Sequence, residues 1–124
     1  MEKTLVIDGK PILFKCTGGF LLRYRELVGQ DPLRDIVKIQ DLSKDGNLDV
    51  TDLTVDDLDT LYNIVWVMAR TADPEIPSLV DWVDSFNEFP LADIFVDLIE
   101  LFTFAFKSNL TMRGPKKKVV KTSR

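Results

Sequence analysis

Oxygen-bearing side chains gather in one stretch of this 124-residue chain at spacings that suit a hard cation. Counted as a twelve-residue loop, the stretch places these residues at ligand positions: Asp41, Ser43, Asp45, Asn47, Asp49 and Asp52. Gly46 falls at the sharp turn of such a loop, and Leu48 falls at its apolar eighth position. Oxygen ligands at alternating positions are typical of a calcium loop. Residues 41–52 are therefore the sharpest candidate for a metal site.

The same segment differs from known calcium loops in two respects. It resembles an EF-hand loop and a dockerin loop, but Asp52 stands where an EF-hand prefers a bidentate glutamate. EF-hands pair, and dockerins are duplicated on secreted proteins, whereas this chain offers one copy of the loop and no signal peptide. The simpler interpretation is a flexible acidic linker whose aspartates and glycine form turns. We predict the linker, with no metal and no cofactor, and keep a calcium-dependent protein-binding module as the alternative.

Residues that commonly carry catalysis are few. The chain has no histidine, the commonest general base, so its one cysteine, Cys16, lacks the partner of a Cys-His nucleophile. Cys16 ends a strand-like run, where a small buried apolar side chain is the simpler interpretation. A single cysteine forms no internal disulfide, which suits a reducing compartment. We expect no catalytic residue and a protein that is not an enzyme.

Hydrophobic periodicity predicts the elements that would position any site. Two β-prone runs, residues 4–7 and 12–16, flank Asp8-Gly9-Lys10-Pro11, which is a strong hairpin signal. Helical patterns follow over about residues 20–29, 32–40, 54–70, 78–86 and 90–107. The predicted helix signals are a stop at Gly29, a start at Asp31-Pro32, and caps at Thr54 and Ser78. We predict an α+β fold, an N-terminal β-hairpin packed on about five α-helices, as a single domain over residues 1–107.

Charge is segregated along the chain. Residues 41–100 hold fifteen acidic side chains against Lys44 and Arg70, whereas residues 107–124 hold seven basic side chains and no acid. We expect residues 108–124 to form a disordered, flexible basic tail that can contact acidic faces of its own body or of a neighbouring subunit. The lysines at 116–118 have no interleaved aromatics, so we predict no specific nucleic-acid binding.

Two further absences bear on location. Aspartates interrupt the longest apolar runs, so we expect no segment that spans a membrane. The first residues lead straight into a strand-like pattern without a basic start and an apolar stretch, so we expect no secretory signal. The sequence therefore predicts a cytoplasmic protein.

The last helical pattern is apolar on more than one side. Its regular stripe comprises Leu91, Ile94, Phe95, Leu98, Leu101 and Phe102. Four other apolar residues lie off that stripe: Val96, Ile99, Phe104 and Phe106. A small monomer has little interior in which to bury both sides, and surplus apolar surface usually marks an interaction site. We predict that these four residues bind another protein chain, and self-association is one form of this prediction.

Several stretches, taken in order, carry a resemblance to a known family. They are residues 7–10, 20–27, 29–33, 58–70, 72–79 and 82–86. The most specific is Ala72-Asp73-Pro74-Glu75-Ile76-Pro77-Ser78-Leu79, followed by Trp82-Val83-Asp84-Ser85-Phe86. The chain resembles the short tail assembly chaperones of siphophages and prophages of Gram-positive bacteria. In that family the segment corresponding to residues 41–57 is a variable linker, which again favours the linker over calcium.

The resemblance implies a function for the whole chain. Members of the family coat the tape measure protein and recruit tail tube protein subunits during phage tail assembly, and they are absent from the finished virion. The implied location is the cytoplasm of an infected or lysogenic bacterial host. Many members also exist as a longer product of ribosomal frameshifting, and the codons of Lys116-Lys117-Lys118 form an A-rich stretch where a slippery site would lie.

Overall fold

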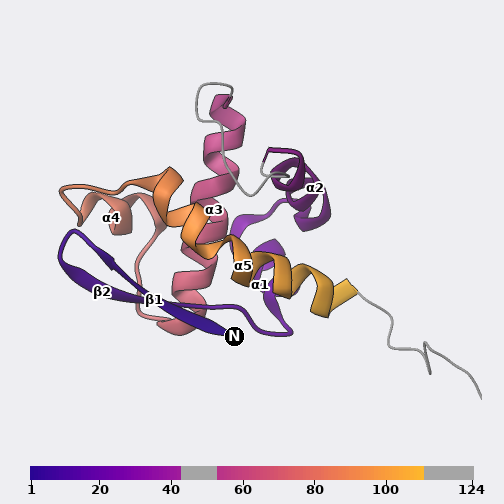
Figure 1. The fold of residues 1–124 in the computed structure, drawn as a ribbon, viewed down its shortest axis with the longest axis horizontal. Coiled ribbons are helices and arrows are strands. Elements are labelled where there is room, and N and C mark those ends of the chain that lie inside the picture. The colour runs from indigo at the N-terminus through magenta and orange to yellow at the C-terminus, as the bar shows by residue number, and fades with distance from the viewer. Residues whose placement is uncertain (43–52, 111–124) are drawn as a thin grey trace, which may run out of the picture.

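The chain forms an antiparallel hairpin followed by five α-helices within residues 1–42 and 53–110 (Figure 1). Those residues are the ones that the computed structural model describes, with side chains described for 1–41 and 53–104. The elements are β1 (Glu2–Ile7), β2 (Lys10–Lys15), α1 (Phe20–Val28), α2 (Pro32–Leu42), α3 (Val55–Ala72), α4 (Leu79–Asp84) and α5 (Leu91–Leu110). The predicted α+β fold, a hairpin packed on about five helices, is confirmed.

The hairpin turns through two residues with left-handed backbone. Asp8 has a φ of 53° and Gly9 a φ of 77°, the conformation that a tight two-residue hairpin turn requires. Ile7 pairs with Lys10, so the turn is shorter than the predicted four-residue link. Ile7 and Phe14 point inward and are buried, and β2 packs on α3. The Asp8 carboxylate then accepts a hydrogen bond from the Asn87 backbone N–H at 2.9 Å, which joins the turn to the link before α5.

Local signals set three of the helix ends as predicted. Gly29 has a φ of 76° and ends α1, and its N–H donates to the Arg25 carbonyl at 2.9 Å. Asp31 Oδ1 accepts from the Leu33 N–H at 3.0 Å at the start of α2. At the start of α3, Thr54 and Asp57 form a capping box.

The start of α4 differs from its prediction. Ser78 occupies the N-cap position, but its side chain makes no capping hydrogen bond. Instead, α3 holds the segment before it: Trp66 Nε1 donates to the Pro77 carbonyl at 2.9 Å, and Arg70 Nη1 donates to the Ile76 carbonyl at 3.1 Å. The Arg70 guanidinium also lies over the Trp66 ring, 5.6 Å from its centroid. These side chains anchor the stretch that carries the most specific part of the family resemblance.

Helix α3 lies at the centre of the fold, with the hairpin and α4 on one side and α2 on the other (Figure 1). It packs against β2, α1, α2, α4 and α5, so its burial is not confined to one stripe. Val67 in the middle of this helix is fully buried, whereas Leu58 near its start is 38% exposed.

Helix α5 covers one side of this core. The predicted stripe from Leu91 to Phe102 is buried, and Phe102 packs edge-on against Phe20 of α1 at 6.2 Å between ring centroids. The helix continues to Leu110, beyond the predicted domain boundary at residue 107. Residues 108–110 of the predicted tail over 108–124 are therefore helical, and residues 111–124 lie outside the described part. None of the helices in the described part of the chain is long and apolar enough to cross a membrane.

Candidate protein-binding surfaces

Helix α5 carries the residues that the sequence proposed for partner binding. Phe104 is 48% exposed, two residues beyond the buried Phe102. Val96 and Ile99 are half-buried, and Ile99 packs against the core. Phe106 lies on the same helix, but its side chain is outside the described part. Among the described members of the set, Phe104 therefore offers the most surface to another chain, and Val96 and Ile99 contribute the edges of their side chains.

Of the candidate calcium residues, only Asp41 lies in the described part of the chain. Asp41 lies in the last turn of α2 and is exposed. Ser43, Asp45, Asn47 and Asp52 lie outside the described residues, so the predicted linker and the calcium alternative both remain untested there. Within residues 1–42 and 53–110, no group of three or more acidic or cysteine side chains could hold a metal ion.

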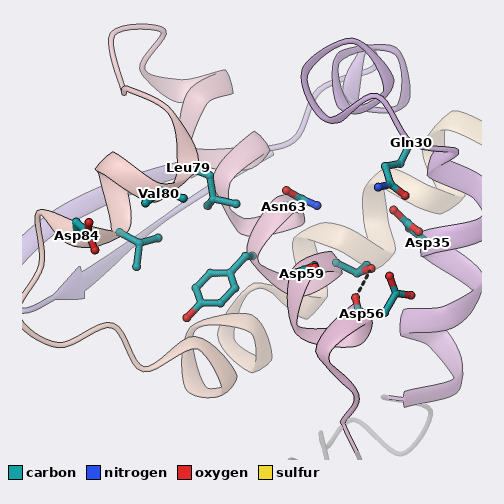
Figure 2. Close-up of a pocket in the computed structure, with 11 residues that line it drawn as sticks. Gln30, Asp35, Asp56, Asp59, Asn63, Leu79, Val80 and Asp84 are labelled. Carbon is teal, nitrogen blue, oxygen red and sulfur yellow. Dashed lines mark hydrogen bonds between the residues drawn. The ribbon is translucent and has the colours of Figure 1, made fainter.

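A groove of about 480 Å³ runs across α3 between α2 and α4 (Figure 2). Its apolar side comes from α4, which contributes Leu79, Val80 and Val83, and from Tyr62 of α3. Val80 is 68% exposed, a large fraction for a branched apolar side chain. The Tyr62 ring stacks on Phe89, with 6.0 Å between ring centroids, which holds this apolar side in place. The groove therefore offers an apolar contact surface that the fold itself does not cover.

Carboxylates give this groove its charge. Asp56 and Asp59 come from α3 and Asp84 from the end of α4, and all three are exposed. Asp59 and Asp84 make no ion pair with any other described residue. Figure 2 shows Asp84 beside Val80 at one end and Asp59 near the middle of the groove. Apolar surface and unpaired negative charge together suit a partner segment that is both basic and apolar.

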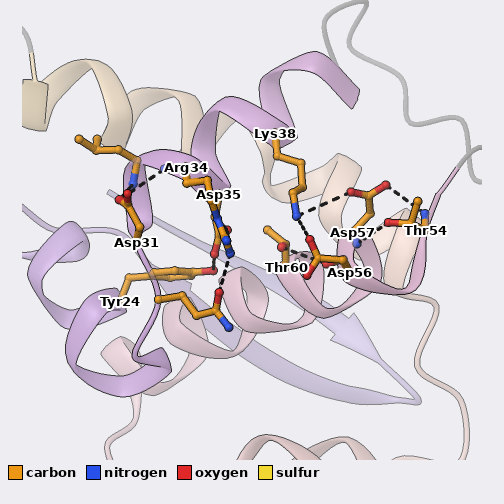
Figure 3. Close-up of polar contacts among 11 residues, drawn as sticks. Tyr24, Asp31, Arg34, Asp35, Lys38, Thr54, Asp56, Asp57 and Thr60 are labelled. Carbon is orange, nitrogen blue, oxygen red and sulfur yellow. Dashed lines mark hydrogen bonds and ion pairs between the residues drawn. The ribbon is translucent and has the colours of Figure 1, made fainter.

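A buried polar cluster holds the α2 side of the groove in place (Figure 3). The Tyr24 hydroxyl of α1 donates to Asp35 Oδ2 at 2.7 Å, and Arg34 Nη2 lies 3.2 Å from Asp35 Oδ1. Asp35 is 2% exposed and Tyr24 is 1% exposed. Burial raises the pKa of Tyr24 well above its ordinary value, and the hydrogen bond to Asp35 raises it further. The hydroxyl therefore stays protonated as the donor that joins α1 to α2.

A second polar contact joins α2 to the start of α3. The Lys38 ammonium forms an ion pair with Asp56 and lies 4.0 Å from Asp57 Oδ1 (Figure 3). The hydrogen bond and positive charge of Lys38 lower the pKa of the Asp56 carboxyl. Because Asp57 also belongs to the capping box of α3, Lys38 connects α2 to a helix start that is already fixed.

The one cysteine is inaccessible. Cys16 is 2% exposed, and its burial raises the pKa of the thiol to about 12. A buried thiol that stays protonated is a poor nucleophile. The predicted role of Cys16 as a small buried apolar residue therefore agrees with its position.

In comparisons with protein-family models, with curated proteins and with solved structures, nothing matches this chain.

Sequence reasoning did not find the groove. Its side chains come from helices far apart in the sequence, and their periodicity alone does not place them together. One signal was present: Val80 lies off the stripe that Leu79, Trp82, Val83 and Phe86 form on the same short helix. An apolar residue next to Asp81, on the solvent side of a six-residue helix, indicates exposed apolar surface.

Proposed function

We propose that this protein is a tail assembly chaperone of a Gram-positive siphophage or prophage. In this role it is a non-enzymatic adaptor that binds the tape measure protein and tail tube subunits in the cytoplasm of the bacterial host. The proposal is supported by the ordered stretches of the sequence that resemble this family. The most specific of them, residues 72–79, is the segment that Trp66 and Arg70 hold against α3.

The observation that carries the proposal is the exposure of Phe104. The buried stripe of α5 already satisfies the core, so the 48% exposed ring contributes little to it. Large aromatic side chains supply much of the binding energy at protein interfaces, particularly where they enter a pocket on the partner. A tape measure protein is a long, largely helical polymer with repeated apolar faces, and a chaperone that coats it needs an aromatic contact of this kind.

The charge of the body suits the same task. Residues 41–100 are strongly acidic, with fifteen acidic side chains against two basic ones. Like charges on neighbouring copies keep a coated polymer soluble, and they steer each copy toward basic surfaces of a partner. The α5 surface would then supply most of the affinity, and the acidic body would supply solubility and a faster encounter.

Co-expression tests this function. The full chain is produced with the tape measure protein from the same tail gene cluster, and separately with the tail tube protein. We expect the tape measure protein to stay soluble and to co-purify with many copies of the chain, whereas without the chain it precipitates. A tape measure protein that remains insoluble and unbound in the presence of the folded chain would contradict the proposal.

A further inference from the structure

We propose that the groove between α2, α3 and α4 binds the C-terminal segment of the same molecule, residues 111–124. The groove has a defined volume of about 480 Å³, exposed apolar side chains and unpaired carboxylates. The segment that follows α5 has the complementary composition. This docking depends only on charge, shape and chain length, so it does not rest on the function proposed above.

Charge is the first match. Residues 111–124 carry six basic side chains and no acidic one: Arg113, Lys116, Lys117, Lys118, Lys121 and Arg124. In the groove, Asp59 and Asp84 are exposed and form no ion pair with the rest of the described chain. Exposed charges attract one another over roughly 10 Å at 0.1 M salt, so the contact strengthens as the salt concentration falls.

Apolar surface is the second match. Val119 and Val120 form an apolar pair between Lys118 and Lys121. On the groove side, the 68% exposed Val80 lies beside Asp84, with Leu79 and Val83 on the same helix. In the proposed contact, Val119 and Val120 pack on the apolar side chains of α4, and the basic residues on either side of them lie near the groove carboxylates.

Chain length favours the same molecule over a second copy. Helix α5 ends at Leu110, and fourteen residues follow it. Fully extended at ~3.4 Å per residue, the whole segment reaches about 48 Å, and Val119 and Val120, which follow Leu110 by nine and ten residues, reach about 31 and 34 Å. A 20-residue helix such as α5 spans about 30 Å. A short tether holds its end at an effective concentration in the millimolar range, well above micromolar free copies. The segment of the same molecule therefore occupies the groove first, and any other basic ligand has to displace it.

A spin label at the end of the segment tests this docking in the full chain. The label is attached to Ser123→Cys. Cys16 remains in place, because its buried thiol is protected from the reagent. We expect the label to broaden the backbone amide signals of Asn63, Val80 and Val83 at low salt and to release them at high salt. Mixing spin-labelled chains without ¹⁵N with unlabelled ¹⁵N chains reports contacts between molecules, and we expect no broadening in that mixture.

A matched pair of variants identifies the site. Asp59→Asn with Asp84→Asn removes two charges from the groove, and Glu26→Gln with Glu100→Gln removes two from exposed positions outside its lining. We expect the groove variant to lower the docking equilibrium about fivefold. The control should behave as the unaltered chain.

Three results would overturn the docking. The first is an absence of broadening at low salt. The second is the same loss of broadening in the groove variant and in its control. The third is broadening in the mixed sample as strong as in the fully labelled one, which would mean that a second copy occupies the groove. Spectra without the label establish that each variant keeps its fold.

Discussion

The outer side of α5 and the groove across α3 present different chemistry to a partner. Helix α5 offers an exposed ring, Phe104, and the half-buried side chains of Val96 and Ile99. The groove offers a space of about 480 Å³ in which apolar side chains of α4 lie next to exposed carboxylates. The α5 surface is thus an apolar projection, and the groove is an acidic concave site.

Because of this difference, the two proposed contacts should respond differently to salt. Contacts made by large rings depend on buried area and tolerate salt, whereas contacts made by exposed carboxylates weaken as salt rises. We therefore expect partner binding at α5 to survive at high salt and segment docking in the groove to be lost. Salt dependence alone separates the two surfaces.

The largest effect is expected within α5 itself. Phe102 is 2% exposed and Phe104 is 48% exposed, so the two rings differ in burial while sharing a helix. Replacing the buried ring in Phe102→Ser leaves a cavity and should lower the free energy of unfolding by ~3–5 kcal/mol. Phe104→Ser should lower it by less than about 1 kcal/mol. Urea unfolding of both variants measures this contrast, and equal losses would mean that Phe104 belongs to the core.

A smaller effect is expected on the α2 side of the groove. In Asp35→Ala the buried Tyr24 hydroxyl loses its acceptor, and the free energy of unfolding should fall by ~1–3 kcal/mol. Tyr24→Phe removes the donor and should cost less than Asp35→Ala. In a double-mutant cycle, the loss in the double variant should be smaller than the sum of the two single losses. Strict additivity would mean that the 2.7 Å hydrogen bond does not link α1 to α2 as described. Binding at α5 should not change in either variant.

The smallest effect concerns the ion pair between α2 and α3. Lys38 lowers the pKa of Asp56, so the pair contributes stability above the ordinary carboxyl pKa and loses it as the pH falls below about 4. Asp56 is largely exposed, which keeps this contribution small. Thermal unfolding between pH 5 and pH 3 should show a slightly steeper loss in the unaltered chain than in Lys38→Met. A steeper loss in Lys38→Met would mean that Lys38 does not stabilise the fold through the ionised Asp56 carboxylate.

The predictions that the structure confirmed rest on local signals. The Asp8-Gly9 turn needs left-handed backbone, and Gly29 ends a helix for the same reason. The capping box of Thr54 and Asp57 and the buried stripe of α5 likewise involve residues close together in the sequence. Such features can be predicted because neighbouring residues determine them.

The features that sequence reasoning missed depend on contacts between distant elements. Val67 is buried because other elements pack on more than one side of α3, which no single stripe reveals. The Ser78 side chain makes no cap because Trp66 and Arg70 hold the preceding backbone from another helix. The groove arises in the same way, since α2, α3 and α4 each contribute part of its lining.

The most direct test of the account is co-purification of the tape measure protein with the double variant Phe104→Ser and Phe106→Ser. A matched control, Val6→Ser with Val55→Ser, removes apolar side chains that are 73% and 77% exposed elsewhere on the surface. We expect the double variant to keep its helical circular dichroism and to lose the tape measure protein, whereas the control retains it. A folded double variant that still binds the tape measure protein as well as the unaltered chain would contradict the account.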